Sequence, residues 1–112
     1  MSWYDALGLA FYLVAGHALG DRGLQPSNLS SGKRRDLNPG TWWQYLLAHG
    51  LIHGLIVAVI THIWILGVLE TWAHMEIDRA KGRGKITNMT DQILHMVCKL
   101  VWWCIVVLAS YA

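Results

Sequence analysis

Four apolar stretches alternate with two polar, basic stretches along the chain. The apolar stretches cover about residues 2–21, 41–61, 63–78 and 88–111, and the basic stretches cover residues 22–40 and 79–87. Each apolar stretch is near the length that a helix needs to cross roughly 30 Å of hydrocarbon, although the third is short. We therefore expect an all-α protein in which the 112 residues form a single four-helix transmembrane bundle.

The second and third apolar stretches meet around His62 without a proline or a charged spacer. This junction permits either a tight turn or one long, kinked helix. The turn is preferred, because about forty unbroken helical residues would exceed the thickness of a bilayer by a wide margin.

Composition and charge support a membrane location. Hydrophobic residues make up 54% of the chain, charged residues only 14%, and there are seven Trp, which is too apolar for an ordinary soluble domain of this size. All Lys and Arg residues except Lys99 belong to the two basic stretches or their edges. Four spans would place both basic stretches on one side of the membrane, and the positive-inside rule makes that side cytoplasmic.

Titratable residues recur four positions apart, with one pair in each apolar stretch. The pairs are His17 with Asp21, His49 with His53, His74 with Asp78, and Asp91 with His95. Residues at i and i+4 share one face of a helix, so each helix can offer two ligands to one metal or to adjacent metals. At about 1.5 Å per residue, all four pairs can lie in one layer of the cytoplasmic half of the membrane. We therefore predict that these eight residues form a metal site.

The pairs are compatible with more than one kind of chemistry. Mixed His and carboxylate ligands from facing helices suit a divalent transition metal such as zinc, iron or manganese. A His–Asp pair can instead be a plain hydrogen-bonded contact, because charged groups inside a membrane need partners. Haem ligation by two histidines is a third option, but carboxylates make a poor haem pocket and no C-x-x-C-H motif is present. Cys98, three residues after His95, is either a soft ligand or a buried bystander thiol.

The motifs that contain these pairs resemble those of a family of small bacterial and phage integral membrane proteins of unassigned function. The matching positions are His17, Asp21, Leu24 and Gln25, then His49 and His53, then His74, Asp78 and Lys81, and finally Asp91, Gln92 and His95. The family is similar in motif style to predicted membrane-bound metal-dependent hydrolases. The chain departs from the pattern at Arg22, where an aromatic residue is usual, and at residues 76–77, which replace a more apolar stretch. The resemblance implies a protein of the bacterial inner membrane.

Two classes of function follow from these observations. The first is a metal-dependent hydrolase that acts on a lipid-linked or phosphorylated substrate at the cytoplasmic leaflet, with Glu70 or Asp21 as general base. The second is a non-enzymatic small membrane protein, for example one encoded by a phage, that oligomerises or binds a host membrane complex, with a structural His and Asp cluster. The expected partners are membrane lipid and either a second copy or another membrane protein, and we expect no nucleic acid.

Overall fold

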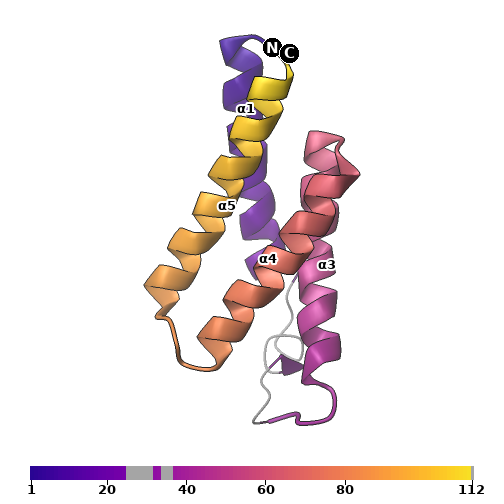
Figure 1. Ribbon diagram of the computed structural model, residues 1–112, viewed down its shortest axis with the longest axis vertical. Helices are drawn as coiled ribbons and strands as arrows, with labels where there is room; N and C mark the ends of the chain where they lie inside the picture. The colour runs from indigo at the N-terminus through magenta and orange to yellow at the C-terminus, as the bar shows by residue number, and fades with distance from the viewer. Residues whose placement is uncertain (25–31, 34–36, 112) are drawn as a thin grey trace.

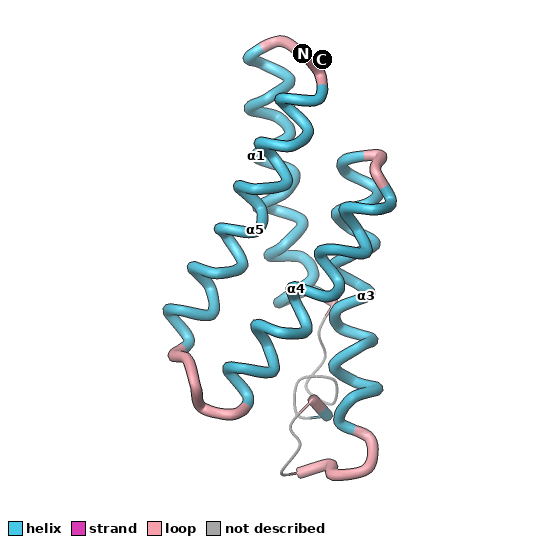
Figure 2. The backbone as a smooth tube through the Cα atoms, in the orientation of Figure 1, coloured by secondary structure: helices cyan, strands magenta, loops and turns pink. Residues whose placement is uncertain are grey.

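A computed structural model of the chain describes residues 1–24, 32–33 and 37–111. Within these residues it contains four long α-helices, one π-helical segment and no strand, so the all-α expectation is confirmed (Figures 1 and 2). The elements are α1 (Trp3–Ala18), η1 (Leu19–Gly23), α3 (Trp42–Thr61), α4 (Trp64–Gly82) and α5 (Asn88–Ala109). Part of the expected basic stretch 22–40, with Gln25, Arg34 and Arg35, lies outside the described residues.

Two helices begin at side-chain caps that the sequence supplies. Ser2 and Asp5 form a capping box at the start of α1, where the Ser2 Oγ accepts a hydrogen bond from the Asp5 amide at 3.1 Å. Thr87 caps α5, because its Oγ1 accepts from the Thr90 amide at 3.1 Å. These caps satisfy amides that have no partner within the first turn of a helix.

A tight turn joins α3 to α4. His62 adopts the left-handed conformation with a φ of 59°, and Ile63 is extended, so the two helices are separate. Thr61 stabilises the turn: its Oγ1 donates to the Val57 carbonyl at 2.8 Å and accepts from the Ile63 amide at 3.2 Å. The structure thus shows the turn and excludes the single kinked helix.

The bundle is elongated, with principal dimensions of 47 × 23 × 22 Å. Figure 1 shows the two termini together at one end, with the α3–α4 turn in the same half of the molecule. The start of α3 and the α4–α5 connection lie at the opposite end. The start of α3, which follows the first basic stretch, and the α4–α5 connection, which is part of the second, therefore lie at a common end.

Glycines bring α3 and α4 into close contact. A Cβ atom added to Gly54 would lie 2.5 Å from the Gly67 carbonyl oxygen, and one added to Gly67 would lie 2.6 Å from the Gly54 carbonyl oxygen. Neither backbone can move away without separating the helices. Small residues permit this approach, as is typical of helix pairs in membranes.

Each helix carries one inward-facing stripe whose character changes along the bundle. Toward the termini, the stripes supply an apolar core of Leu9, Leu13, Val57, Leu66 and Trp102. Toward the other end, the same stripes carry His17 on α1, His74 on α4, and His95 with Asp91 on α5. The interior is therefore apolar in one half and polar in the other.

The outer surface is strongly apolar. Phe11, Leu55, Trp72 and Leu108 are each more than 60% exposed, as examples of a larger set on all four helices. Two helices, α3 and α5, are long and apolar enough to cross a membrane, a criterion that a core helix of a soluble protein can also meet. Only 17% of the most apolar part of α5 is buried, so α5 is not a core helix of this chain.

Candidate metal centre

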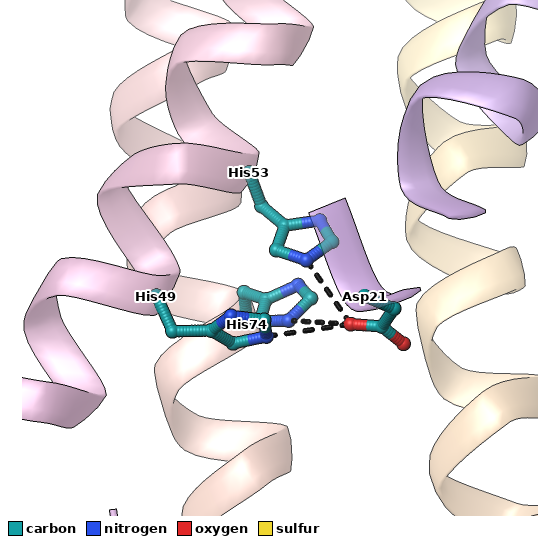
Figure 3. Close-up of side chains that lie close together, drawn as sticks. All are labelled: Asp21, His49, His53 and His74. Carbon is teal, nitrogen blue, oxygen red and sulfur yellow. Dashed lines mark ion pairs between the residues drawn. The ribbon is translucent and has the colours of Figure 1, made fainter. Parts of the chain in front are cut away.

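A π-helical segment at the end of α1 positions the first carboxylate of the cluster. The Leu24 amide donates to the Leu19 carbonyl at 2.8 Å, which is the i to i+5 hydrogen bond of a π-helix. Such segments widen one turn of a helix and are frequent at functional sites. In this chain the segment directs Asp21 back toward α3 and α4 (Figure 3).

One oxygen of Asp21 lies at the convergence of three imidazoles, which come from α3 and α4 (Figure 3). Asp21 Oδ1 is 3.3 Å from His49 Nε2, 3.1 Å from His53 Nε2 and 3.8 Å from His74 Nε2. His49 and His53 lie on successive turns of α3, and the rings of His53 and His74 stack with their centroids 3.7 Å apart. Four potential ligand atoms from three elements therefore surround one point.

A second group of ligand atoms lies beside the first. Asp78 Oδ1 is 3.2 Å from His95 Nε2, which is in turn 3.5 Å from Asp91 Oδ1. Lys33 Nζ donates to Asp78 Oδ2 at 3.0 Å, and Lys81 Nζ is 3.9 Å from Asp91 Oδ2. This group joins the end of α4 to the start of α5.

His17 and Gln92 connect the two groups. His17 Nε2 lies 3.2 Å from Asp21 Oδ2 and 3.4 Å from the Gln92 side-chain oxygen. The Gln92 amide nitrogen donates to Asp21 Oδ2 at 3.3 Å and to Asp91 Oδ2 at 3.1 Å. Gln92 thus orients a carboxylate from each group.

The structure brings all eight ligands proposed from the sequence into one cluster. They form three sets that could each hold a metal ion, namely Asp21 with His49, His53 and His74; His17 with His74 and His95; and Asp78 with Asp91 and His95. Each of the five histidines is at most 4% exposed. The sixth histidine, His62, is exposed at the α3–α4 turn in the other half of the molecule.

The geometry of the cluster fits a metal ion. His49, His53 and His74 each have a buried Nε2 atom without a hydrogen-bond partner among the described residues, although a carboxylate oxygen is close. Two ligands bound at about 2.1 Å to one tetrahedral metal lie about 3.4 Å apart. The nitrogen–oxygen separations at Asp21 Oδ1, from 3.1 to 3.8 Å, are close to this value. An ion at this point would satisfy nitrogen atoms that hydrogen bonds leave unsatisfied.

The Asp21 carboxyl lies within 3.3 Å of three imidazole nitrogens, those of His17, His49 and His53. A deprotonated carboxylate at this position would be an anionic metal ligand.

Glu70 lies on the Nδ1 side of His74, whereas the cluster lies on the Nε2 side. It is fully buried, pairs with Lys99, and accepts a hydrogen bond from Trp102 Nε1 at 2.8 Å. Its Oε1 atom is 3.5 Å from His74 Nδ1, while His74 Nε2 faces Asp21. Glu70 is thus the carboxylate next to the second ring nitrogen of His74, the place at which a hydrogen-bonded carboxylate fixes the ring of a metal ligand, although His74 Nδ1 makes no hydrogen bond among the described residues.

A polar cavity of about 140 Å³ opens over the cluster at the end of the bundle where α4 and α5 connect. Its lining includes the carboxylates of Asp21, Asp78 and Asp91 and the cationic residues Arg22, Lys33 and Lys81. A larger cavity of about 490 Å³ adjoins it and shares Lys33 and Asp78 with it, but its lining also includes apolar residues of α3. The carboxylates of the cluster therefore line a cavity at this end, whereas the histidines lie deeper.

Sequence reasoning assigned no role in the site to Lys99 or Gln92. Lys99 stood apart as the one basic residue within an apolar stretch, a signal for a buried acidic partner. Gln92 was part of a motif, but only the structure shows that it bridges two carboxylates. Cys98 belongs to none of the three ligand sets and packs against the apolar core.

Comparison with known proteins yields one match. The family described as "Protein of unknown function (DUF3307)" matches residues 9–112, nearly the whole chain. No curated protein and no solved structure matches the chain. The expectation of a family without an assigned function agrees with this result.

Proposed function

The chain belongs to the DUF3307 family, whose description names no activity, and we propose from the site itself that it is a membrane-embedded metal-binding protein. We further propose that it is a metal-dependent hydrolase of a lipid-linked or phosphorylated substrate at the cytoplasmic leaflet. The observation that carries the first part is the convergence of the unsatisfied His49, His53 and His74 nitrogens on Asp21.

The distribution of residues supports a membrane location with four spans. The chain buries histidines, Glu70, Asp91 and Lys99 and exposes large apolar side chains, which is the reverse of a soluble protein. A bundle 47 Å long matches the roughly 40 to 45 Å of a bilayer with its headgroup regions. α1 has 16 residues, and η1 continues it toward the required length. The start of α3 and the α4–α5 connection lie at one end, and by the positive-inside rule the basic stretches next to them would make that end cytoplasmic.

The polar cavity supports hydrolysis at that end. A bound divalent metal would lower the pKa of a water molecule toward neutrality and polarise the bond to be cleaved. Asp21 lines the cavity and is the better candidate for general base, because Glu70 is engaged by Lys99 and Trp102 on the other side of His74. Lys33 and Lys81, on the cavity wall, would attract an anionic substrate group. The chemistry resembles that implied by the hydrolase-like motifs.

The first test is metal content, measured by elemental analysis of detergent-purified protein that has not met a chelator. We expect near-stoichiometric metal in the wild type and its loss in His74→Ala. His62→Asn is the matched control, because His62 lies outside the cluster and asparagine tolerates the left-handed conformation at this turn. Equal metal content in His74→Ala and His62→Asn would contradict the proposed site.

The second test separates an enzyme from a structural cluster. Asp78→Asn should abolish phosphate release from vesicles that contain a phosphorylated lipid, while the protein stays folded in detergent. If Asp78→Asn lowers only the thermal stability, the cluster is structural. The chain would then belong to the alternative class, a non-enzymatic membrane protein that oligomerises or binds a membrane complex.

A further inference from the structure

Asp78 lies between two groups of potential metal ligands. Its Oδ2 atom is 3.5 Å from His49 Nε2 and 3.6 Å from His74 Nε2, whereas its Oδ1 atom is 3.2 Å from His95 Nε2. The two oxygens of one carboxylate thus face different imidazoles. We propose that the cluster holds two divalent metal ions bridged by the Asp78 carboxylate, an inference that rests on the metal-binding function proposed above.

The three ligand sets permit two ions at once. The set of Asp21, His49, His53 and His74 has no residue in common with the set of Asp78, Asp91 and His95. The remaining set takes His74 from the first and His95 from the second. If each side chain offers one terminal ligand atom, only the two sets without a common residue, the one with Asp21 and the one with Asp91, can be filled together. These are called the first and the second position below. Asp78 belongs to the set with Asp91 and His95, and its Oδ2 atom also lies within 3.6 Å of two ligand nitrogens of the other set, so its carboxylate is placed to bridge the two.

Burial and spacing support both positions. Asp91 is 2% exposed, and its Oδ1 atom has no hydrogen-bond partner among the described residues, so the second position, like the first, contains an unsatisfied buried atom. The rings of His74 and His95, one from each position, stack with their centroids 4.0 Å apart. The two positions are therefore adjacent.

The two positions differ in ligand chemistry. Three imidazoles and one carboxylate surround the first position, a set that suits zinc or iron. Two carboxylates and one imidazole surround the second, a more oxygen-rich set that suits manganese. The first position should therefore bind Zn²⁺ in preference to the second, and both should accept Mn²⁺ when it is the only metal present.

The test is a titration of the metal-stripped full chain in detergent with Mn²⁺, followed by electron paramagnetic resonance. Wild type should bind two ions per chain and show a spin-coupled pair. Asp91→Asn, which removes one ligand of the second position, should bind one ion and lose the coupling. Glu76→Gln is the matched control, because Glu76 is an exposed carboxylate of α4 outside the ligand sets, and it should bind two.

Each outcome decides the question. One ion per chain in the wild type, unchanged by Asp91→Asn, would overturn the two-metal centre and leave the proposed metal-binding function intact. No binding in the wild type would overturn both. If Asp91→Asn does not fold, the wild-type stoichiometry and the presence or absence of spin coupling still decide between one ion and two.

Discussion

Gly20 provides a test of the centre that alters none of its ligands. A Cβ atom at this position would lie 2.6 Å from Cε1 and 2.8 Å from Nε2 of His53. To restore a normal contact of about 3.5 Å, the imidazole would have to retreat by roughly 0.9 Å. It has no room to do so, because it is 1% exposed and stacks on His74 with the ring centroids 3.7 Å apart.

Gly20→Ala should therefore weaken metal binding. Metal–ligand distances tolerate only about 0.2 Å of variation, so a displacement of this size removes His53 as an effective ligand. We expect at least about a tenfold loss of Zn²⁺ affinity, which corresponds to about 1.4 kcal/mol. The assay is competition for Zn²⁺ between the detergent-solubilised protein and a chromophoric chelator.

Gly8→Ala is the matched control for this experiment. Gly8 lies in α1, which η1 with Gly20 continues, but a Cβ atom at Gly8 has no neighbour within 4 Å. Both substitutions favour the helix, by up to about 1 kcal/mol in a helix interior, so a difference between them reports the contact with His53. Equal Zn²⁺ affinity in the two variants would refute the assignment of His53 as a ligand held in place by packing.

Three further predictions concern stability and access. Gly67→Ala should lower the free energy of unfolding by about 1 to 3 kcal/mol, because the new methyl group meets the backbone of α3. Chemical denaturation in detergent measures this change, and an unchanged denaturation midpoint would contradict the close contact. Glu70→Gln should lower the free energy of unfolding by on the order of 3 kcal/mol, because it leaves the Lys99 ammonium buried without a counter-charge. Addition of Lys99→Met should recover part of this loss, whereas strictly additive losses in the double-mutant cycle would argue against the pair. Lys81→Ala should leave the metal content unchanged but weaken the binding of inorganic phosphate to the metal-loaded protein, as measured by calorimetry. An unaltered phosphate affinity would exclude an anion-binding role for this residue.

The helical fold and the grouping of the eight His and Asp side chains followed from sequence because both depend on local spacing. Pairs four residues apart share a helix face wherever the helix is placed, so the grouping of His49 with His53 needed no tertiary information. The turn at His62 followed from length alone. The proposed four spans do not follow from composition in the same way, because among the described helices only α3 and α5 are long and apolar enough to cross a membrane.

The details of the centre depend on tertiary contacts that no spacing encodes. The π-helical segment that directs Asp21 inward has no distinctive sequence signal, although Gly20 and Gly23 flank the carboxylate. The proposed preference for Asp21 over Glu70 as general base also rests on the structure, because both residues lie in helical segments that face the cluster. Asp21 lines the polar cavity, whereas Glu70 pairs with Lys99 and Trp102 on the other side of His74.

The inward stripes, half apolar and half polar, bear on how the chain assembles. Under the proposed four-span arrangement, α4 carries Glu70, His74 and Asp78 on one face, and a charged side chain at the bilayer centre costs roughly 2.5 to 3.5 kcal/mol. Lys99, which pairs with Glu70, lies on α5, and α5 follows α4 in the chain. Under that proposal, the packing of α5 against α4 supplies the counter-charge of Glu70 and favours the assembled bundle over an isolated α3–α4 hairpin in lipid.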